Sequence, residues 1–158
     1  SLSPWSYIGR TSSLRRWSAE TCRYLPMDLD IVSYASHLDD CPWESKASDP
    51  TRTDVVRWKQ MVSAGRRPSA GVSMGLLEFP VGTSIRLHHH TPPEIYYVKS
   101  GLAKLRLAET VQSLRAGGFA YIPGSAPHAI ANIGQERMEL IWVFPTDTWD
   151  EVEYLYLE

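Results

Sequence analysis

Two histidines separated by one residue, a Pro-Pro turn and a glutamate stand close together in this chain. The stretch from residue 82 to residue 101 reads GTSIRLHHHTPPEIYYVKSG. Side chains two apart on a strand point to the same face, so we expect His88 and His90 to project together and His89 to project away. The Pro-Pro pair cannot continue a strand ladder and turns the chain before Glu94. A hairpin of this kind places two imidazoles and one carboxylate around a single point.

The side chains of this hairpin are typical metal ligands. Two imidazoles and a carboxylate suit Zn, Fe(II), Mn, Co or Ni, and no cysteine lies nearby to favour a thiolate-preferring site. Three protein ligands are the minimum for a stable metal site, and His128 is the candidate for a fourth. It begins a strand after the turn PGSAP, where the rim of a barrel would present it inward. His37 and His89 are expected to be ordinary surface or packing residues.

Short apolar segments separated by turn residues fill the chain from Gly71 onward. Most are rich in β-branched and aromatic residues, and no helix-length segment lies between them. Such strands without crossover helices predict a β-sandwich or a small barrel rather than a parallel sheet covered by helices. The eight predicted strands are residues 71–79, 83–89, 94–101, 102–108, 110–114, 118–123, 128–133 and 138–145.

The part of the chain before position 70 has a different pattern. Apolar residues follow a helical period over residues 31–38 and again over residues 55–62, which predicts two helices. Residues 1–20 show no period and are expected to be flexible or to lie as an arm on the rest. We therefore assign residues 1–70 to an N-terminal arm and helices packed on the barrel, and residues 71–158 to the metal-binding barrel, as one structural domain. The acidic, aromatic tail is expected to add a short strand or helix.

Charge and composition limit the partners and the location. Sixteen Lys and Arg against eighteen Asp and Glu give a net charge of −2, so a nucleic-acid partner is not expected. No run approaches the roughly 18 apolar residues that a membrane span needs. Residues 1–20 lack the apolar region of a secretory signal, which favours a cytoplasmic protein; the first residue is not Met, so a periplasmic location stays open. Cys22 and Cys41 are expected to be free thiols, with a single bridge as the alternative.

The hairpin and the His128 segment together resemble the paired motifs of the cupin superfamily, whose members are small jelly-roll barrels of the double-stranded β-helix type. The first motif matches at Gly82, His88, His90, Glu94 and Gly101. The second matches at Gly117, Pro123, His128 and Asn132, with Ser125 where a glycine is usual. The resemblance covers about residues 71–145 and implies a mainly β cupin barrel that binds a divalent metal through His88, His90, Glu94 and His128. It says little about the reaction, because this fold carries dioxygenases, isomerases, lyases and non-enzymatic binders.

Tyr96 narrows the choice among these reactions. It follows Glu94 by two residues on the same inward face, so its hydroxyl should lie beside the metal. A nearby divalent cation favours the phenolate, which could remove a proton α to a metal-bound carboxylate. The alternative is that Tyr96 is a core residue whose hydroxyl is hydrogen-bonded.

The chain length, the His-x-His-x-x-x-Glu-x-Tyr hairpin and the distant histidine resemble the short cupin-type dimethylsulfoniopropionate (DMSP) lyases of marine bacteria. The resemblance implies that the four ligands hold Fe(II) or Mn(II), with Zn, Co or Ni as alternatives. It further implies that Tyr96 is the base of a β-elimination that yields dimethyl sulfide and acrylate. The substrate is then a small zwitterion whose sulfonium favours aromatic faces. Tyr121 and Trp142 are candidates to line its pocket, with core packing as the alternative.

Two rival interpretations stay open. The same ligands could serve a sugar or sugar-phosphate isomerase or an Fe(II) dioxygenase; a phosphosugar would require basic groups at the rim, where Arg86 and Lys99 flank the hairpin. The other rival is a non-catalytic, ligand-binding cupin. The oligomeric state is also open, with a homodimer as one option, and the predicted helical face around Val55, Trp58 and Met61 could cover a sheet edge or a partner.

Overall fold

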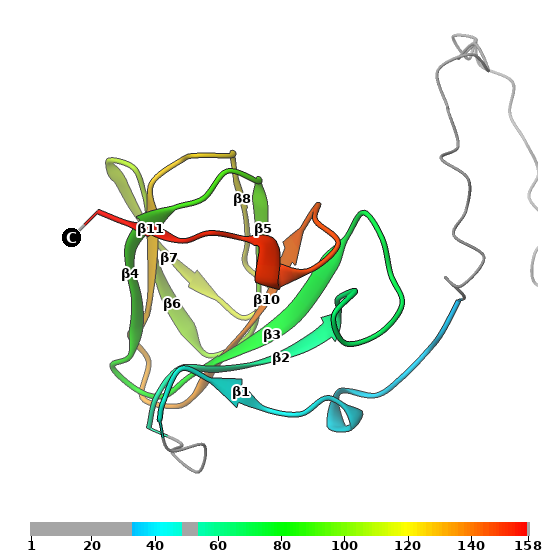
Figure 1. The fold of residues 1–158 in the computed structure, drawn as a ribbon. Helices are drawn as coiled ribbons and strands as arrows, with labels where there is room; N and C mark the ends of the chain where they lie inside the picture. The colour runs from blue at the N-terminus through cyan, green and yellow to red at the C-terminus, as the bar shows by residue number, and fades with distance from the viewer. Residues whose placement is uncertain (1–32, 49–53, 158) are drawn as a thin grey trace, which may run out of the picture.

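The computed structural model describes residues 33–48 and 54–157, which form a barrel of short strands (Figure 1). Within these ranges the helical elements are two single 3-10 turns, η1 (Leu38–Asp40) and η2 (Trp149–Glu151). The strands are β1 (Glu44–Ser45), β2 (Arg57–Val62), β3 (Ser73–Phe79), β4 (Ser84–His89), β5 (Glu94–Ser100), β6 (Leu102–Leu107), β7 (Thr110–Arg115), β8 (Phe119–Ile122), β9 (His128–Asn132), β10 (Met138–Phe144) and β11 (Leu155–Tyr156).

The strands build two antiparallel sheets that face each other. One sheet has the order β1-β2-β3-β10-β5-β8, and the other has the order β11-β4-β9-β6-β7. Strands β3 to β10 coincide with the eight predicted strands, and short turns rather than helices connect them. The prediction of a mainly β jelly-roll barrel is therefore confirmed.

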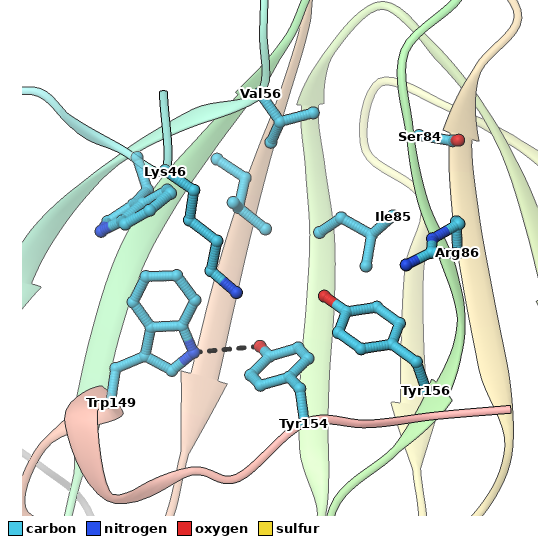
Figure 2. Close-up of a pocket in the computed structure, with 10 residues that line it drawn as sticks. Lys46, Val56, Ser84, Ile85, Arg86, Trp149, Tyr154 and Tyr156 are labelled. Atoms are coloured by element: carbon cyan, nitrogen blue, oxygen red, sulfur yellow. Dashed lines mark hydrogen bonds between the residues drawn. The ribbon is translucent and has the colours of Figure 1, made fainter. Parts of the chain in front are cut away.

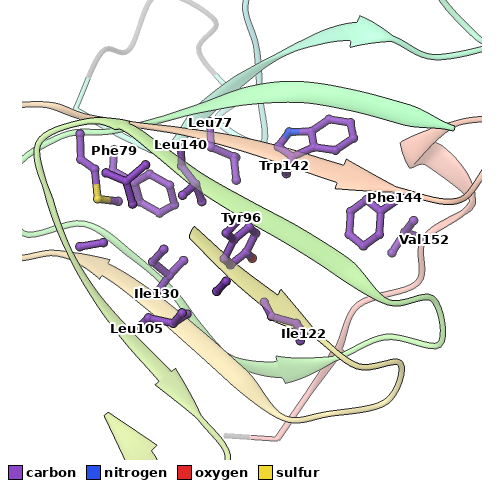
Figure 3. Packing of buried hydrophobic residues seen from close by; sticks show 14 residues of the cluster. Leu77, Phe79, Tyr96, Leu105, Ile122, Ile130, Leu140, Trp142, Phe144 and Val152 are labelled. Carbon is purple, nitrogen blue, oxygen red and sulfur yellow. The ribbon is translucent and has the colours of Figure 1, made fainter. Parts of the chain in front are cut away.

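The hydrophobic core fills the space between the two sheets (Figure 3). Its side chains alternate along each strand, as expected when one face of a sheet is buried and the other is solvated. On β5, Tyr96 and Val98 are buried, whereas Ile95 and Tyr97 are exposed. The same alternation turns Glu94 inward, so the packing of the core also sets the direction of the candidate site residues on this strand.

The predicted helix over residues 55–62 is wrong, because most of this segment is strand β2. Trp58 pairs with Leu77 in the antiparallel register of β2 and β3. Three valines in the segment are β-branched and favour a strand, and the edge of β3 pairs with the segment from Arg57 to Val62, with one register shift. Packing of Trp58 edge-on against Trp149, with ring centroids 4.9 Å apart, adds burial on the inner face of the sheet. The apolar surface expected here is therefore a sheet face and not a helix face.

The earlier predicted helix, over residues 31–38, is wrong for the residues that the structure describes. Residues 33–37 contain no helix, and the chain then forms only the single turn η1. Residues 31 and 32 lie outside the described ranges. Strands β1 and β2 come before residue 71 but pair within the same sheet as β3, so residues on both sides of position 70 build the barrel.

Several predictions concern residues that the structure describes only in part. The arm over residues 1–20 and Cys22 lie outside the described ranges. Cys41 is buried and free. Among the described residues, no helix is long and apolar enough to cross a membrane.

Gly75 is required where three strands meet closely. It lies on β3 opposite Gln60 of β2 and Trp142 of β10. A Cβ at this position would lie 2.3 Å from the carbonyl oxygen of Lys59 and 2.4 Å from Cζ2 of Trp142. Neither neighbour is a flexible side-chain end, so the sheet would have to shift.

We therefore expect Gly75→Ala to lower the free energy of unfolding by about 1–3 kcal/mol, the usual cost of overpacking a core. Denaturant unfolding of the two proteins measures this difference. Gly65→Ala is the matched control, because a Cβ there meets its nearest atom at an ordinary 3.4 Å. Equal midpoints for wild type and Gly75→Ala would show that β2 and Trp142 of β10 can move away from β3 without cost.

Candidate metal centre

Three histidines from three segments of the barrel converge at one buried point. His88 is near the end of β4, His90 follows that strand, and His128 begins β9 directly opposite His88 in the sheet register. All three side chains are buried, and one ring nitrogen from each lies within 4.8 Å of the others. His89 lies between the first two and pairs with Leu155 of β11. The predicted separation of His89 from its neighbours is therefore seen in the structure.

Main-chain carbonyls fix the orientation of all three rings. Nδ1 of His88 donates to the carbonyl of Arg86 at 2.7 Å, and Nδ1 of His90 donates to that of Pro92 at 2.9 Å. Nδ1 of His128 donates to the carbonyl of Ala126 at 2.8 Å. A carbonyl only accepts hydrogen bonds, so each ring carries its proton on Nδ1 and directs Nε2 toward the common point. This arrangement is typical of histidines that ligate a metal through Nε2.

Glu94 places a carboxylate among the three rings. Its Oε2 lies 3.1 Å from Nε2 of His90 and 3.4 Å from Nε2 of His128, and the side chain is buried. The structure therefore brings together all four side chains that the sequence singled out, from β4, its following turn, β5 and β9.

The unsatisfied atoms at this point fit a cation. Within the described part of the chain, Nε2 of His88 and Nε2 of His128 are buried without a hydrogen-bond partner. A buried polar nitrogen without a partner is costly, and a bound ion supplies the missing partner to both. Three imidazole nitrogens and one carboxylate oxygen match the donors that first-row divalent metals take in proteins. This group of residues can therefore hold a divalent metal ion.

Burial perturbs the protonation of this centre in the metal-free chain. Desolvation lowers the pKa of His88 from 6.5 to about 4, and the neighbouring rings of His128 and His90 add to the effect. Between about pH 6.5 and about pH 4 the unfolded chain therefore binds a proton at His88 that the folded chain still excludes.

We accordingly expect the chelator-treated protein to lose stability as the pH falls from about 6.5 to about 4, and this contribution to level off below that range. Thermal unfolding between pH 7.5 and 3.5 measures the effect. His88→Gln removes the titrating group and should give a shallower dependence over the same window. An equally steep dependence in that variant would assign the acid sensitivity to other groups.

Tyr96 lies beside the same centre, as predicted. Its side chain is 1% exposed, and its ring meets that of His128 edge-on with centroids 6.1 Å apart. Burial raises the pKa of the Tyr96 hydroxyl well above its ordinary value, and the negative charge of Glu94 and a hydrogen bond with that carboxylate raise it further. The phenol is therefore protonated in the metal-free chain and lies close enough to the candidate ligand Glu94 for that carboxylate to affect its pKa.

A second tyrosine at the centre, Tyr154, was not anticipated from the sequence. The C-terminal segment, red in Figure 1, runs from the end of β10 across to β4, where β11 pairs with the strand that carries His88. The Tyr154 ring stacks on that of His88 with centroids 4.8 Å apart and an interplanar angle of 25°, and its hydroxyl accepts a hydrogen bond from Trp149 at 3.0 Å. Burial and the charge of Glu94 raise the pKa of Tyr154 well above its ordinary value. The one sequence signal was the pair Tyr154 and Tyr156, spaced to share a strand face.

A cavity of about 360 Å³ lies next to the centre, and Tyr154 forms part of its wall (Figure 2). Aromatic and aliphatic side chains dominate the lining, and Figure 2 shows the Lys46 side chain extending into the space between Trp149 and Val56. The guanidinium of Arg86 lies 5.1 Å from the ring centroid of Tyr156. The lining residues are Lys46, Val56, Trp58, Leu77, Ser84, Ile85, Arg86, Trp149, Tyr154 and Tyr156. A small molecule in this cavity would contact several ring faces and two cationic side chains.

The two aromatics proposed from the sequence do not line this cavity. Tyr121 lies on the outer face of β8 and is 64% exposed. Trp142 is fully buried and packs against Phe144 and Trp149, which is the core role given as the alternative. Of the two basic residues that flank the hairpin, Arg86 borders the cavity, whereas Lys99 forms an ion pair with Glu139.

The fold and this histidine-rich centre define the chain as a cupin barrel. Residues 75–144 match the family described as a cupin domain, and the chain belongs to the cupin superfamily. It is 29% identical over 139 residues to dimethylsulfoniopropionate lyase DddW of Ruegeria pomeroyi, an alignment that covers 88% of this chain and 90% of the relative. It is 34% identical over 89 residues to the uncharacterised protein MJ1618 of Methanocaldococcus jannaschii, covering 54% of this chain and 71% of that protein.

A solved structure with a different chemistry shares the same fold. The polyketide cyclase RemF of Streptomyces resistomycificus superposes with a TM-score of 0.66 at 16% identity, covering 80% of this chain and 87% of the cyclase. At this level of identity the similarity concerns the fold alone. The reaction must therefore be argued from the site.

Proposed function

We propose that this protein is a metal-dependent carbon–sulfur lyase that cleaves DMSP to dimethyl sulfide and acrylate. The observation that carries the proposal is the buried phenol of Tyr96, whose ring packs edge-on against His128 at a point where three histidines converge. The similarity to lyase DddW over 88% of the chain supports the choice of substrate.

We infer that His88, His90, Glu94 and His128 hold the ion. Fe(II) or Mn(II) is the preferred occupant, with Zn, Co and Ni as alternatives, because imidazole and carboxylate donors accept all of them. When bound, the divalent metal supplies positive charge that favours a substrate carboxylate nearby and stabilises the Tyr96 phenolate.

Tyr96 is then the base. Its oxygen takes the proton from the carbon next to the substrate carboxylate, and the electron pair of that C–H bond forms the carbon–carbon double bond. The bond between the β-carbon and sulfur breaks at the same time, and its electron pair leaves with the sulfur. A sulfonium leaves as a neutral sulfide, so no acid is needed. The proton on Tyr96 returns to solvent, which balances the reaction.

The cavity provides the remaining recognition. The rings of Trp149, Tyr154 and Tyr156 offer faces to which a sulfonium cation is attracted. Tyr154 both lines the cavity and stacks on His88, so the proposed reaction requires its ring to move aside and admit the substrate from the cavity to Tyr96 and the ligands. A buried location of this kind also keeps water from the carbanion-like transition state.

The test is incubation of metal-loaded protein with DMSP, followed by headspace detection of dimethyl sulfide and detection of acrylate in solution. Equimolar production of the two compounds is the expected result. Absence of sulfide from protein that contains its metal would overturn the lyase proposal and leave the cupin assignment intact.

A second candidate function has one observation in its favour. Lys46 and Arg86 bring two positive charges to the cavity, and an anionic substrate such as a sugar phosphate would pair with them. An isomerase acting on such a substrate could use the same four ligands. To distinguish the two candidates, a panel of sugar phosphates is added to the same metal-loaded protein and isomerisation is followed by NMR. Only one of the two substrate classes should be converted.

A further inference from the structure

The outer face of the five-stranded sheet carries a groove that follows β9. Leu105 and Ile130 point into the core, so the residues next to them on β6 and β9 point outward. Ala129 and Ala131 of β9 form a low floor, and longer side chains of the two neighbouring strands, β4 and β6, stand on either side of it. We call this hollow of about 540 Å³ the basic groove. Its lining residues are Ser84, Ile85, Arg86, Lys104, Arg106, Glu109, Val111, Ala129, Ile130 and Ala131.

Both walls of the basic groove carry positive charge. Lys104 and Arg106 lie on β6 and pair in register with the two alanines of the floor. Arg86 lies on β4, the neighbour of β9 on the other side. Glu109 is the one carboxylate among the lining residues, so three positive groups stand against one negative group, in a chain whose net charge is −2. A cleft lined by one sign of charge concentrates ligands of the opposite sign.

The two cations of β6 have no counter-charge in the described protein. Within residues 33–48 and 54–157, no carboxylate lies within ion-pair distance of Lys104 or Arg106. Nε of Arg106 donates to the carbonyl of Ala108 at 3.1 Å, which orients the guanidinium and leaves its two terminal nitrogens without a partner in the described chain. An anion from solution would supply the missing partners. By contrast, four cations elsewhere each pair with a carboxylate: Arg57, Arg66, Lys99 and Arg137.

The spacing of the cations fits two linked anionic groups. Adjacent strands lie about 4.8 Å apart, so β4 and β6 stand about 10 Å apart on either side of β9. Lys104 and Arg106 are two residues apart on one strand, which separates them by about 7 Å. One phosphate can pair with these two cations, and a second phosphate joined to it extends toward Arg86 on the opposite wall. The arginines bind phosphate oxygens in pairs, and the lysine binds them as a point charge.

The remaining lining residues limit the ligand to a small molecule. Glu109 lies in the turn between β6 and β7, so a long polyanion that followed the groove would meet a negative charge there. A volume of about 540 Å³ is typical of sites for small molecules. The alanine floor and Val111 offer an apolar surface to an organic part of the ligand. We propose that the basic groove binds a diphosphate group, either free or as part of a nucleoside diphosphate, at a site separate from the metal centre.

Arg86 is unsuitable for testing this proposal, because it also borders the aromatic cavity beside the metal centre (Figure 2). Its guanidinium lies 5.1 Å from the ring centroid of Tyr156, so a substitution there would disturb both places. Lys104 and Arg106 line the basic groove and not that cavity. They are the residues to substitute.

The test is isothermal titration calorimetry with inorganic pyrophosphate and with ADP, at about 0.15 M salt and without added metal. Both ligands should bind the wild type. Lys104→Gln should weaken binding by about 10-fold, and Lys104→Gln/Arg106→Gln by about 100-fold, because each substitution removes a charge-assisted hydrogen bond. Thermal unfolding should show that both variants stay folded, since Lys104 is exposed and makes no hydrogen bond in the described chain.

Two control variants separate the groove from general attraction and from the metal centre. Arg115 of β7 pairs with Leu102, two positions before Lys104, so it lies on the same face of the sheet but outside the groove. Arg115→Gln should leave both affinities unchanged. His128→Ala disrupts the metal centre on the inner face and should also bind both ligands as the wild type does.

The outcomes separate the two sources of the diphosphate. Tighter binding of ADP than of pyrophosphate identifies a nucleotide as the ligand, and equal or weaker binding of ADP identifies free diphosphate. The proposal is overturned if the wild type binds neither ligand at about 1 mM, or if the double variant binds as well as the wild type. It is also overturned if Arg115→Gln or His128→Ala loses as much affinity as Lys104→Gln. None of these measurements uses DMSP turnover, so failure here is distinct from failure of the lyase proposal.

Discussion

Tyr96→Phe is expected to lower the turnover of DMSP by about 10²- to 10⁴-fold, the usual contribution of a positioned general base. The substitution removes one oxygen atom and keeps the ring, which is buried in the core and packs edge-on against His128. The metal ligands are untouched. The amount of metal per chain, measured by mass spectrometry, should therefore equal that of the wild type, while dimethyl sulfide release falls.

Tyr97→Phe is the control for this variant. It makes the same chemical change at the next residue, on the opposite and exposed face of β5. We expect wild-type turnover from it. If Tyr96→Phe retained full activity with its metal bound, Tyr96 would be a packing residue, and the base would have to be another group at the centre. A loss of metal in Tyr96→Phe would instead indicate that the phenol acts by holding Glu94 in place.

His128→Ala is expected to abolish metal binding. It removes one of the three imidazoles and leaves His88, Glu94 and His90 without the ring that closes the centre from β9. The metal content should fall from about one ion per chain to a trace, and DMSP turnover should fall with it. Added metal at about 100 times its dissociation constant should stabilise the wild type by about 2.7 kcal/mol, and His128→Ala should show no such gain in thermal unfolding.

His89→Ala controls for the loss of a histidine as such. His89 stands between two of the candidate ligands in the sequence but lies on the other face of β4, where it pairs with Leu155. This variant should keep its metal and its thermal response. Full metal occupancy in His128→Ala would contradict the four-ligand centre and point to a site elsewhere in the chain.

The candidate ligands could be predicted because the information that positions them is local. His88, His90 and Glu94 lie within one hairpin, where the two-residue period of a strand and a Pro-Pro turn decide which side chains meet. To predict that His128 joins these residues, it was enough to expect that its strand pairs with β4. The motif residues around His128 indicated that pairing. The eight strands from residue 71 onward followed from the same alternation and its turn residues.

Non-local pairing explains what the sequence did not predict. Residues 55–62 have apolar spacing that fits a helix, and only the free edge of β3 makes them a strand. Tyr154 reaches His88 from 66 positions along the chain, because the two-residue strand β11 pairs with β4. Tyr121 and Trp142 were placed on barrel strands correctly, but Tyr121 faces outward. Trp142 faces inward and is enclosed by Phe144 and Trp149, a contact that depends on how the C-terminal segment packs.

The hydrogen bonds that orient the three rings have a consequence for engineering this centre. In many metalloproteins the basicity of a ligating histidine can be adjusted by exchanging the side chain that accepts its Nδ1 proton. Here all three acceptors are peptide carbonyls, of Arg86, Pro92 and Ala126, and no substitution can remove them. Directed evolution of metal preference would therefore have to change Glu94 or the tyrosines around it, Tyr96 and Tyr154. The orientation of the three imidazole rings would be retained even when many other residues of the chain are substituted.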